Sequence, residues 1–279
     1  MNQKDMMKFK DEYLARAAKI NPSGLAAQLA YLFLLSLFPF LIFSITLLGH
    51  TSIKADDVID LVKRSVPFET ASIIADNVRD VLAGNNTGLL SFGAVAAIWS
   101  ASSALNCIIN VLDKSYEVTE SRSFIKSRAV AIALTFMMIP AILVSLLLPV
   151  FGEKIGRLVF AYMGLSSVFL TLWNVARWGL SFCIMIGVLA GIYYFAPHKR
   201  PRFKSILAGA LFAAVGWHIV SLGFSYYINH FEHYSAIYGS LGSVIVLMVW
   251  FYVVALLIIL GGVLNSTLEH RASPNNLVP

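Results

Sequence analysis

The chain has 279 residues, of which 58% are hydrophobic and 13% are charged, and its formal net charge at pH 7 is +6. An ordinary soluble domain carries about 25% charged residues, so this composition excludes that class and favours a protein embedded in lipid. Retention of Lys and Arg beside anionic headgroups accounts for the positive charge, and we expect no nucleic-acid partner.

Residues 1–24 predict an amphipathic helix beside the membrane. Lys and Arg side chains are mixed there with Asp and Glu, and the segment has neither a short apolar core nor a small-residue cleavage site. We therefore expect no cleavable signal peptide. The sequence Asn21-Pro22-Ser23-Gly24 predicts the end of this helix, because Pro and Gly interrupt helices.

Six apolar stretches follow, and each is long enough to cross the bilayer. About 20 helical residues span the ~30 Å of hydrocarbon, and no stretch has Asp, Glu, Lys or Arg near its centre. They cover residues 25–49, 88–112, 129–151, 176–195, 205–228 and 242–265. The sequence therefore predicts an all-α fold, a polytopic membrane bundle of six transmembrane helices within residues 25–269, followed by a tail at 270–279.

Lys and Arg are unevenly distributed over the two sides of this predicted bundle. Fourteen of the 21 fall in the N-terminal segment, in the segments after the second and fourth spans, and in the tail. Since Lys and Arg are retained in the cytoplasm, we expect both termini to be cytoplasmic. In the cluster "PHKRPRFK", contacts with anionic lipid headgroups are expected from Lys199, Arg200, Arg202 and Lys204.

Two further segments are expected on the outer side. Residues 50–87 contain apolar stripes at helical spacing and predict a helical extracytoplasmic cap. Residues 155–173 are apolar enough for a seventh span, but a full crossing would move the basic cluster at 198–204 to the outer side. We therefore expect an interfacial or re-entrant helix at 155–173.

Several quoted stretches resemble one family. They are "LAYLFLLSLFPFLI" in the first span, "IWSASSALNCIINVLDKSY" at the end of the second, "SFIKSRAVAIALT" before the third, and the sequence from "YYFAPHKRPRFK" to "YGSLGSVIVLMVWFY". Over about residues 25–269 the chain resembles the YihY/BrkB family of bacterial inner-membrane proteins. The resemblance implies a six-span protein of the inner membrane, suspected of transport, lipid export or serum resistance. Some members carry the label ribonuclease BN.

The residues themselves do not support that label. A metal-dependent nuclease needs clustered His and carboxylate ligands, and the six histidines form no such cluster; His230 and His233 come nearest, and an aromatic interface loop is the simpler interpretation. No serine-hydrolase elbow or phosphate-binding glycine loop occurs either. We expect no catalytic residues, no metal and no cofactor.

Small residues spaced by four predict close packing between helices. Three such sets occur, and a packing role is favoured for each over a pore-lining role. They are Gly187 with Gly191, Gly93 with Ala97 and Ala101, and Ser205 with Gly209 and Ala213.

Polar residues within the spans have two interpretations, because each costs free energy in lipid unless it has a partner. They form hydrogen bonds between helices, or they line a substrate path. Asn106 and Asn110 share a helix face that Asp113 continues. The loop at 229–241, which lacks Lys and Arg, would form the outer mouth. The path hypothesis comprises Gln28, Ser36, Asn106, Asn110, Asp113, His218, Tyr234, Tyr238, Gly239 and Asn265.

Two classes of function follow from the sequence. The first is a transporter or a translocator of lipid or another envelope component. The alternative is a non-transporting envelope scaffold or regulator that acts through its basic loops and outer cap, with a membrane enzyme as a third hypothesis. Transport by the protein in liposomes distinguishes the first class from the second.

Overall fold

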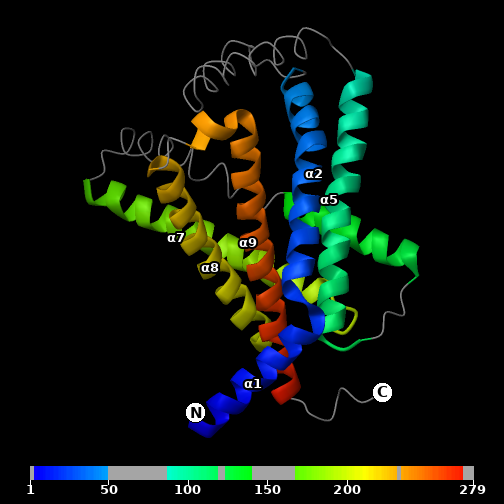
Figure 1. Cartoon of the computed structure of the whole chain (residues 1–279), viewed down its shortest axis with the longest axis vertical. Helices are drawn as coiled ribbons and strands as arrows, with labels where there is room; N and C mark the ends of the chain where they lie inside the picture. The colour runs from blue at the N-terminus through cyan, green and yellow to red at the C-terminus, as the bar shows by residue number, and fades with distance from the viewer. Residues whose placement is uncertain (1–2, 50–86, 119–122, 140–166, 231–233, 273–279) are drawn as a thin grey trace. The chain divides into compact units, whose positions relative to one another are not determined.

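The computed structural model describes residues 3–49, 87–118, 123–139, 167–230 and 234–272, and all the regular elements in these ranges are helices (Figure 1). The elements are α1 (Gln3–Ile20), α2 (Pro22–Gly49), α5 (Thr87–Ser115), a helix at 124–139, α7 (Ser167–Phe195), α8 (Phe203–His230) and α9 (Tyr234–Ala272). The predicted all-α membrane bundle is confirmed.

Four helices in the described ranges are long and apolar enough to cross a membrane. Their apolar parts are Pro22–Ser44, Gly88–Ser115, Phe203–Tyr227 and Val244–Ala272, and Gly179–Phe195 is a shorter apolar segment. The four long helices correspond, in chain order, to the first, second, fifth and sixth predicted spans, and the shorter segment Gly179–Phe195 corresponds to the fourth. The third predicted span is described only as far as residue 139, and the predicted cap at 50–87 lies almost wholly outside the described residues. The count of six spans and the domain bounds stay predictions.

Two helices start earlier than expected. α7 runs without interruption from Ser167, so residues 167–173, assigned above to an interfacial or re-entrant helix, continue directly into the fourth predicted span. The junction Trp173-Asn174-Val175-Ala176 contains no Gly or Pro, which explains why the helix does not break there. α9 is helical from Tyr234, so the predicted loop at 229–241 is helical over its second half. The rest of segment 155–173 lies outside the described residues.

A single residue separates α1 from α2. Asn21 has a φ of 51°, a left-handed conformation that Asn tolerates at a helix end. Its Oδ1 accepts hydrogen bonds from Ser23 Oγ at 3.1 Å and from the backbone N–H of Gly24 at 3.4 Å, which caps α2. Pro22 occupies the first helical position, where its missing N–H costs nothing. The predicted helix end at 21–24 is confirmed.

The helices form two compact units, which are described separately. The second unit, residues 32–101, holds the later part of α2 and the earlier part of α5. At Gly93 a Cβ atom would lie 3.1 Å from the backbone nitrogen of Phe43. The predicted packing role of Gly93 is confirmed, because a larger side chain would push the two helices apart.

The first unit, residues 1–31 and 102–279, contains α1, α7, α8, α9 and the end of α5. α8 packs against both α7 and α9, and α1 crosses the C-terminal end of α9 (Figure 1). The side chains at the centre of this unit are completely buried; they include Tyr193, Leu112, Ile206, Ile259 and Val263. This packed centre holds together the residues of the candidate site.

Candidate functional site

α8 and α9 approach each other closely where Gly209 faces Gly261. A Cβ atom on Gly209 would collide with the carbonyl oxygen of Gly261 and with Oδ1 of Asn265, and a Cβ atom on Gly261 would lie 2.8 Å from the carbonyl oxygen of Gly209. Oδ1 of the buried Asn265 accepts a hydrogen bond from the backbone N–H of Gly209 at 2.7 Å. The glycines therefore make room for a polar side chain between two apolar helices.

A polar face runs along the second half of α5. Its members, Ser103, Asn106, Asn110 and Asp113, are spaced by three, four and three residues, which keeps them on one side of the helix. Over ten residues this polar face is about 15 Å long, half of the ~30 Å hydrocarbon thickness. Uncharged polar groups thus extend well into the apolar part of α5.

The helix at 124–139 provides partners for two members of this face. Oγ of Ser103 accepts a hydrogen bond from Nη1 of Arg128 at 3.0 Å, and Oδ1 of Asn106 accepts one from Oγ of Ser127 at 2.8 Å. Both bonds join α5 to a neighbouring helix. Polar residues in the spans were expected either to bond between helices or to line a substrate path. Asn106 forms a hydrogen bond between helices.

The other two members differ from each other. Asp113 is buried, and its Oδ1 accepts a hydrogen bond from the backbone N–H of His198 at 2.7 Å, which ties the bend after α7 to the end of α5. Asn110 is half-buried, and its amide makes no hydrogen bond to any residue in the described ranges. Asn110 is thus the member of this face for whose side chain the described residues supply no hydrogen bond.

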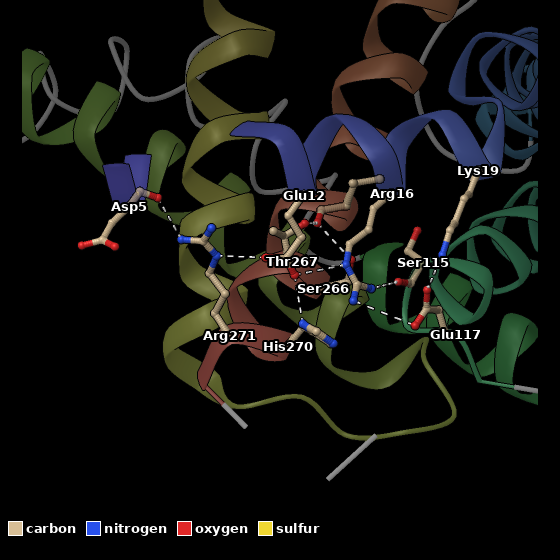
Figure 2. Close-up of polar contacts among 11 residues, drawn as sticks. Asp5, Glu12, Arg16, Lys19, Ser115, Glu117, Ser266, Thr267, His270 and Arg271 are labelled. Carbon is tan, nitrogen blue, oxygen red and sulfur yellow. Dashed lines mark hydrogen bonds and ion pairs between the residues drawn. The ribbon is translucent and has the colours of Figure 1, made fainter. Parts of the chain in front are cut away.

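Glu12 of α1 lies among three basic side chains (Figure 2). Its Oε1 is 2.9 Å from Nδ1 of His270 and 3.6 Å from Nε of Arg16, and its Oε2 accepts a hydrogen bond from Nε of Arg271 at 3.0 Å. Nη1 of Arg271 also donates to the carbonyl oxygen of Asp5 at 3.2 Å. Charged groups therefore fasten α1 to the last turn of α9.

Arg16 and Lys19 fasten α1 to the end of α5 as well (Figure 2). The guanidinium of the buried Arg16 donates to the carbonyl oxygen of Ser115 at 3.4 Å and lies 3.9 Å from Glu117. Nζ of Lys19 donates to Oε1 of Glu117 at 3.1 Å. This hydrogen bond, helped by the positive charge of Arg16, holds the pKa of Glu117 below its usual value.

The side chain of Glu269, near the end of α9, lies beside the N-terminal end of α8. Its Oε2 accepts hydrogen bonds from Oγ of Ser205 at 2.6 Å and from the backbone N–H of Arg202 at 3.1 Å. A carboxylate at this place satisfies an unpaired N–H group and interacts favourably with the helix dipole. Arg202 also donates to the carbonyl oxygen of Ala272 at 3.1 Å, so α8 and α9 are joined at this end too.

The structure describes the surroundings of some of the remaining members of the predicted path, each within its own helix. Gln28 is exposed, and Oγ of Ser36 donates to the carbonyl oxygen of Phe33 at 2.8 Å within its own helix. Nδ1 of His218 lies 2.9 Å from the carbonyl oxygen of Ala214, also within one helix. Tyr234, Tyr238 and Gly239 belong to the first turns of α9, where the side chains lie outside the described residues. The path as a whole stays a prediction.

The basic cluster at 199–204 divides into two groups. Arg200, Arg202 and Lys204 are exposed and Lys199 is half-buried. Of these, Arg202 also contacts Glu269 and Ala272. In the described ranges no three His, Cys, Asp or Glu side chains are placed to hold a metal ion. The "HFEH" pair is not part of that statement, because His233 lies outside the described residues.

Comparison with known proteins gives the family. Residues 14–277 match the family described as virulence factor BrkB, which is nearly the whole chain. The chain belongs to the BrkB family. This confirms the resemblance stated from the span motifs.

Relatives of this BrkB-family chain include membrane proteins from several bacteria. YfkH of Bacillus subtilis, which is named as a ribonuclease-like protein, is 45% identical over 265 residues, covering 95% of this chain and 96% of its own length. A UPF0761 membrane protein of Pseudoalteromonas translucida is 27% identical over 95% of this chain and 86% of its own. A UPF0761 membrane protein of Vibrio vulnificus is 33% identical over 98 residues, which cover 35% of this chain and 31% of its own length. No solved structure matches the chain.

Sequence reasoning missed the group around Glu12. The only local signal was the spacing of Glu12 and Arg16, which are four residues apart and form an ion pair on one helix. Nothing in the sequence marks His270 and Arg271 as partners of α1.

Proposed function

We propose that this BrkB-family protein is a transporter or translocator that moves a polar or amphiphilic solute across the bacterial inner membrane. One observation carries the proposal: Asn110 keeps a half-buried amide without a hydrogen bond to any described residue, in the middle of the polar face of α5. A polar group in an apolar helix costs free energy unless it finds a partner. A passing solute is a partner that the free amide can accept.

The neighbours of Asn110 support the same proposal. Ser103 and Asn106 precede it on this face and Asp113 follows it, so the amide belongs to a row of polar side chains on one side of α5. Because these groups already have protein partners, they fix the shape of the surface and leave Asn110 to exchange hydrogen bonds. A hydroxyl, amide or headgroup oxygen of a solute would form hydrogen bonds with the amide there.

The orientation and the lipid contacts are part of the proposal. α1, the bend at 196–200 and the end of α9 meet at one end of the first unit, and we propose that this end is cytoplasmic, since it carries most of the Lys and Arg. Lys199, Arg200 and Lys204 would contact anionic headgroups there. Arg202, already paired with Glu269, would contribute less.

Reconstitution of the purified protein into liposomes tests transport. One preparation is divided between an assay of ion flux and an assay of lipid scrambling, with protein-free liposomes and liposomes that contain an unrelated multi-pass protein as controls. We expect one of the two signals to exceed both controls. Absence of both signals in folded, correctly inserted protein contradicts the proposal and favours the non-transporting scaffold.

The name of the Bacillus relative suggests nuclease activity as a further alternative. The same preparation, incubated with RNA and a divalent metal ion, should leave the RNA intact. Metal-dependent cleavage that disappears in the His230→Ala variant would establish the enzyme instead.

A further inference from the structure

α9 contains two adjacent glycines, Gly261 and Gly262, ten residues before its end at Ala272. Glycine is the least favourable ordinary residue in a helix after proline, and glycine-containing pairs are among the places where long helices bend. Close packing requires glycine at both positions: a Cβ atom on Gly261 would lie 2.5 Å from Oη of Tyr193 and 2.8 Å from the carbonyl oxygen of Gly209, and one on Gly262 would collide with Cδ2 of Leu112. The pair is therefore an intrinsically weak point that its neighbours hold in place.

α1 contacts α9 on both sides of the glycine pair. Before the pair, Oη of Tyr13 donates to the carbonyl oxygen of Leu260 at 3.4 Å. After it, Glu12 contacts His270 at 2.9 Å and Arg271 at 3.0 Å (Figure 2). From α7, Oη of Tyr193 donates to the carbonyl oxygen of Ile258 at 2.7 Å, so the turn before the pair is held twice.

The segment after the pair is also bound to α8. Asn265 accepts the hydrogen bond of Gly209, and Glu269 accepts those of Ser205 and Arg202. Bending at the glycines would break these bonds and separate the ends of α8 and α9. The ionic contacts of α1 oppose that movement and lie at the partly exposed end of the bundle, where the side chain of Glu12 is 26% exposed.

We propose that Gly261 and Gly262 form a hinge in α9 and that α1 controls it by bridging the hinge. With Glu12 bound to His270 and Arg271, residues 263–272 continue the helix and stay packed on α8. When those contacts open, the segment bends at the glycines and the end of the α8–α9 pair opens. The proposal concerns motion alone and does not depend on transport.

Amide hydrogen exchange of the full-length protein in lipid nanodiscs tests the hinge. In the Glu12→Gln variant we expect exchange at 263–272 to be on the order of tenfold faster than in the unaltered protein, with residues 250–258 unchanged, because one charged partner of the segment is lost. Lys19→Gln is the matched control: it removes an α1 contact with Glu117 and leaves the contacts with α9 in place, so exchange at 263–272 should not change.

Equal acceleration along all of α9, or none at 263–272, overturns the proposal. Arg271→Gln removes the same contact from the other partner and provides the result if Glu12→Gln does not fold. A measurement on the unaltered protein completes the test. If α1 bridges the hinge, α1 and residues 263–272 open together and their slowest amides exchange at rates within about twofold of each other. Clearly different rates for the two segments also overturn the proposal.

Discussion

The backbone N–H of Gly209 donates a hydrogen bond to Oδ1 of Asn265 at 2.7 Å and joins α8 to α9 where the two helices are closest. Asn265 is completely buried, so its amide oxygen would be costly in an apolar bundle without this bond. Gly209 makes the bond geometrically accessible, since any side chain there would occupy the place of the amide oxygen. Packing and polar satisfaction therefore depend on the same position.

Gly209→Ala should lower the stability of the protein. Its methyl group would meet the carbonyl oxygen of Gly261 and the side chain of Asn265, and forcing extra volume into a packed contact costs about 1–3 kcal/mol. Thermal unfolding in detergent measures the effect. Gly187→Ala on α7 is the control, because no atom of the described residues lies within 4 Å of its Cβ position, so the packing role predicted for Gly187 finds no neighbour among them. The alanine also improves helix propensity. An equal decrease of the melting temperature in both variants would show that the close α8–α9 contact at Gly209 does not cause the loss of stability.

Two buried tyrosines should respond oppositely to loss of the hydroxyl. Tyr193→Phe removes the bond to the carbonyl oxygen of Ile258 and should cost about 1 kcal/mol. The hydroxyl of Tyr116 is buried and has no hydrogen-bond partner in the described part of the chain; burial, with the charge of Glu269 second, raises its pKa. Tyr116→Phe should therefore leave the melting temperature unchanged or raise it. A large loss for Tyr116→Phe would indicate a partner beyond the described residues.

Acid should weaken the attachment of α1 to α5 through Glu117. The hydrogen bond from Lys19 lowers the pKa of Glu117 from 4.5, so the stabilisation is complete above pH 4.5 and is lost as the pH falls through the lower folded value. The side chain is 47% exposed, so the effect is small, as for surface ion pairs. Melting temperatures of the unaltered protein and of Lys19→Gln, measured between pH 6 and pH 3, should converge at the acid end. A constant difference over that range contradicts the assignment.

The transmembrane helices could be predicted from the sequence because a membrane span is a long, nearly uncharged apolar stretch. It also predicted the close contact at Gly209, through the spacing of Ser205, Gly209 and Ala213. The junctions were harder. Nothing in the composition of residues 167–176 distinguishes a helix lying along the interface from the start of a span, so α7 was divided where the structure has one helix.

Partners of polar groups could not be predicted. Glu12 and Arg271 are 259 residues apart, and charge alone does not say which of the chain's 21 Lys and Arg residues a carboxylate meets. Asp113 bonds to a backbone N–H at His198, a donor that nearly every residue carries. The sequence thus indicated that Asn106, Asn110 and Asp113 share a face, and only the structure separates the two with partners from Asn110.

Single-cysteine labelling tests the proposed orientation. In a background of Cys107→Ala and Cys183→Ala, Lys8→Cys lies on an exposed position of α1, and Ser65→Cys lies in the predicted outer segment. An impermeant thiol reagent applied to whole cells should modify only Ser65→Cys, because α1 is cytoplasmic in the orientation that we propose from the Lys and Arg distribution. After the cells are opened, both should react. Modification of Lys8→Cys in intact cells would reverse the orientation.

Asn110 and Asn106 form a matched pair that distinguishes a transport role from a packing role. Asn106→Leu removes the bond from Ser127 and should lower stability by about 0.6–2 kcal/mol, the range for interhelical bonds in membranes. Asn110→Leu removes an amide with no bond to a described residue, so the melting temperature should stay the same. If Asn110 contacts the solute, its loss should reduce transport in liposomes on the order of tenfold, as expected for one hydrogen bond. Melting and transport are measured on the same preparations. Full transport by a destabilised Asn110→Leu variant would identify Asn110 as a packing residue and remove the observation on which the transporter proposal rests.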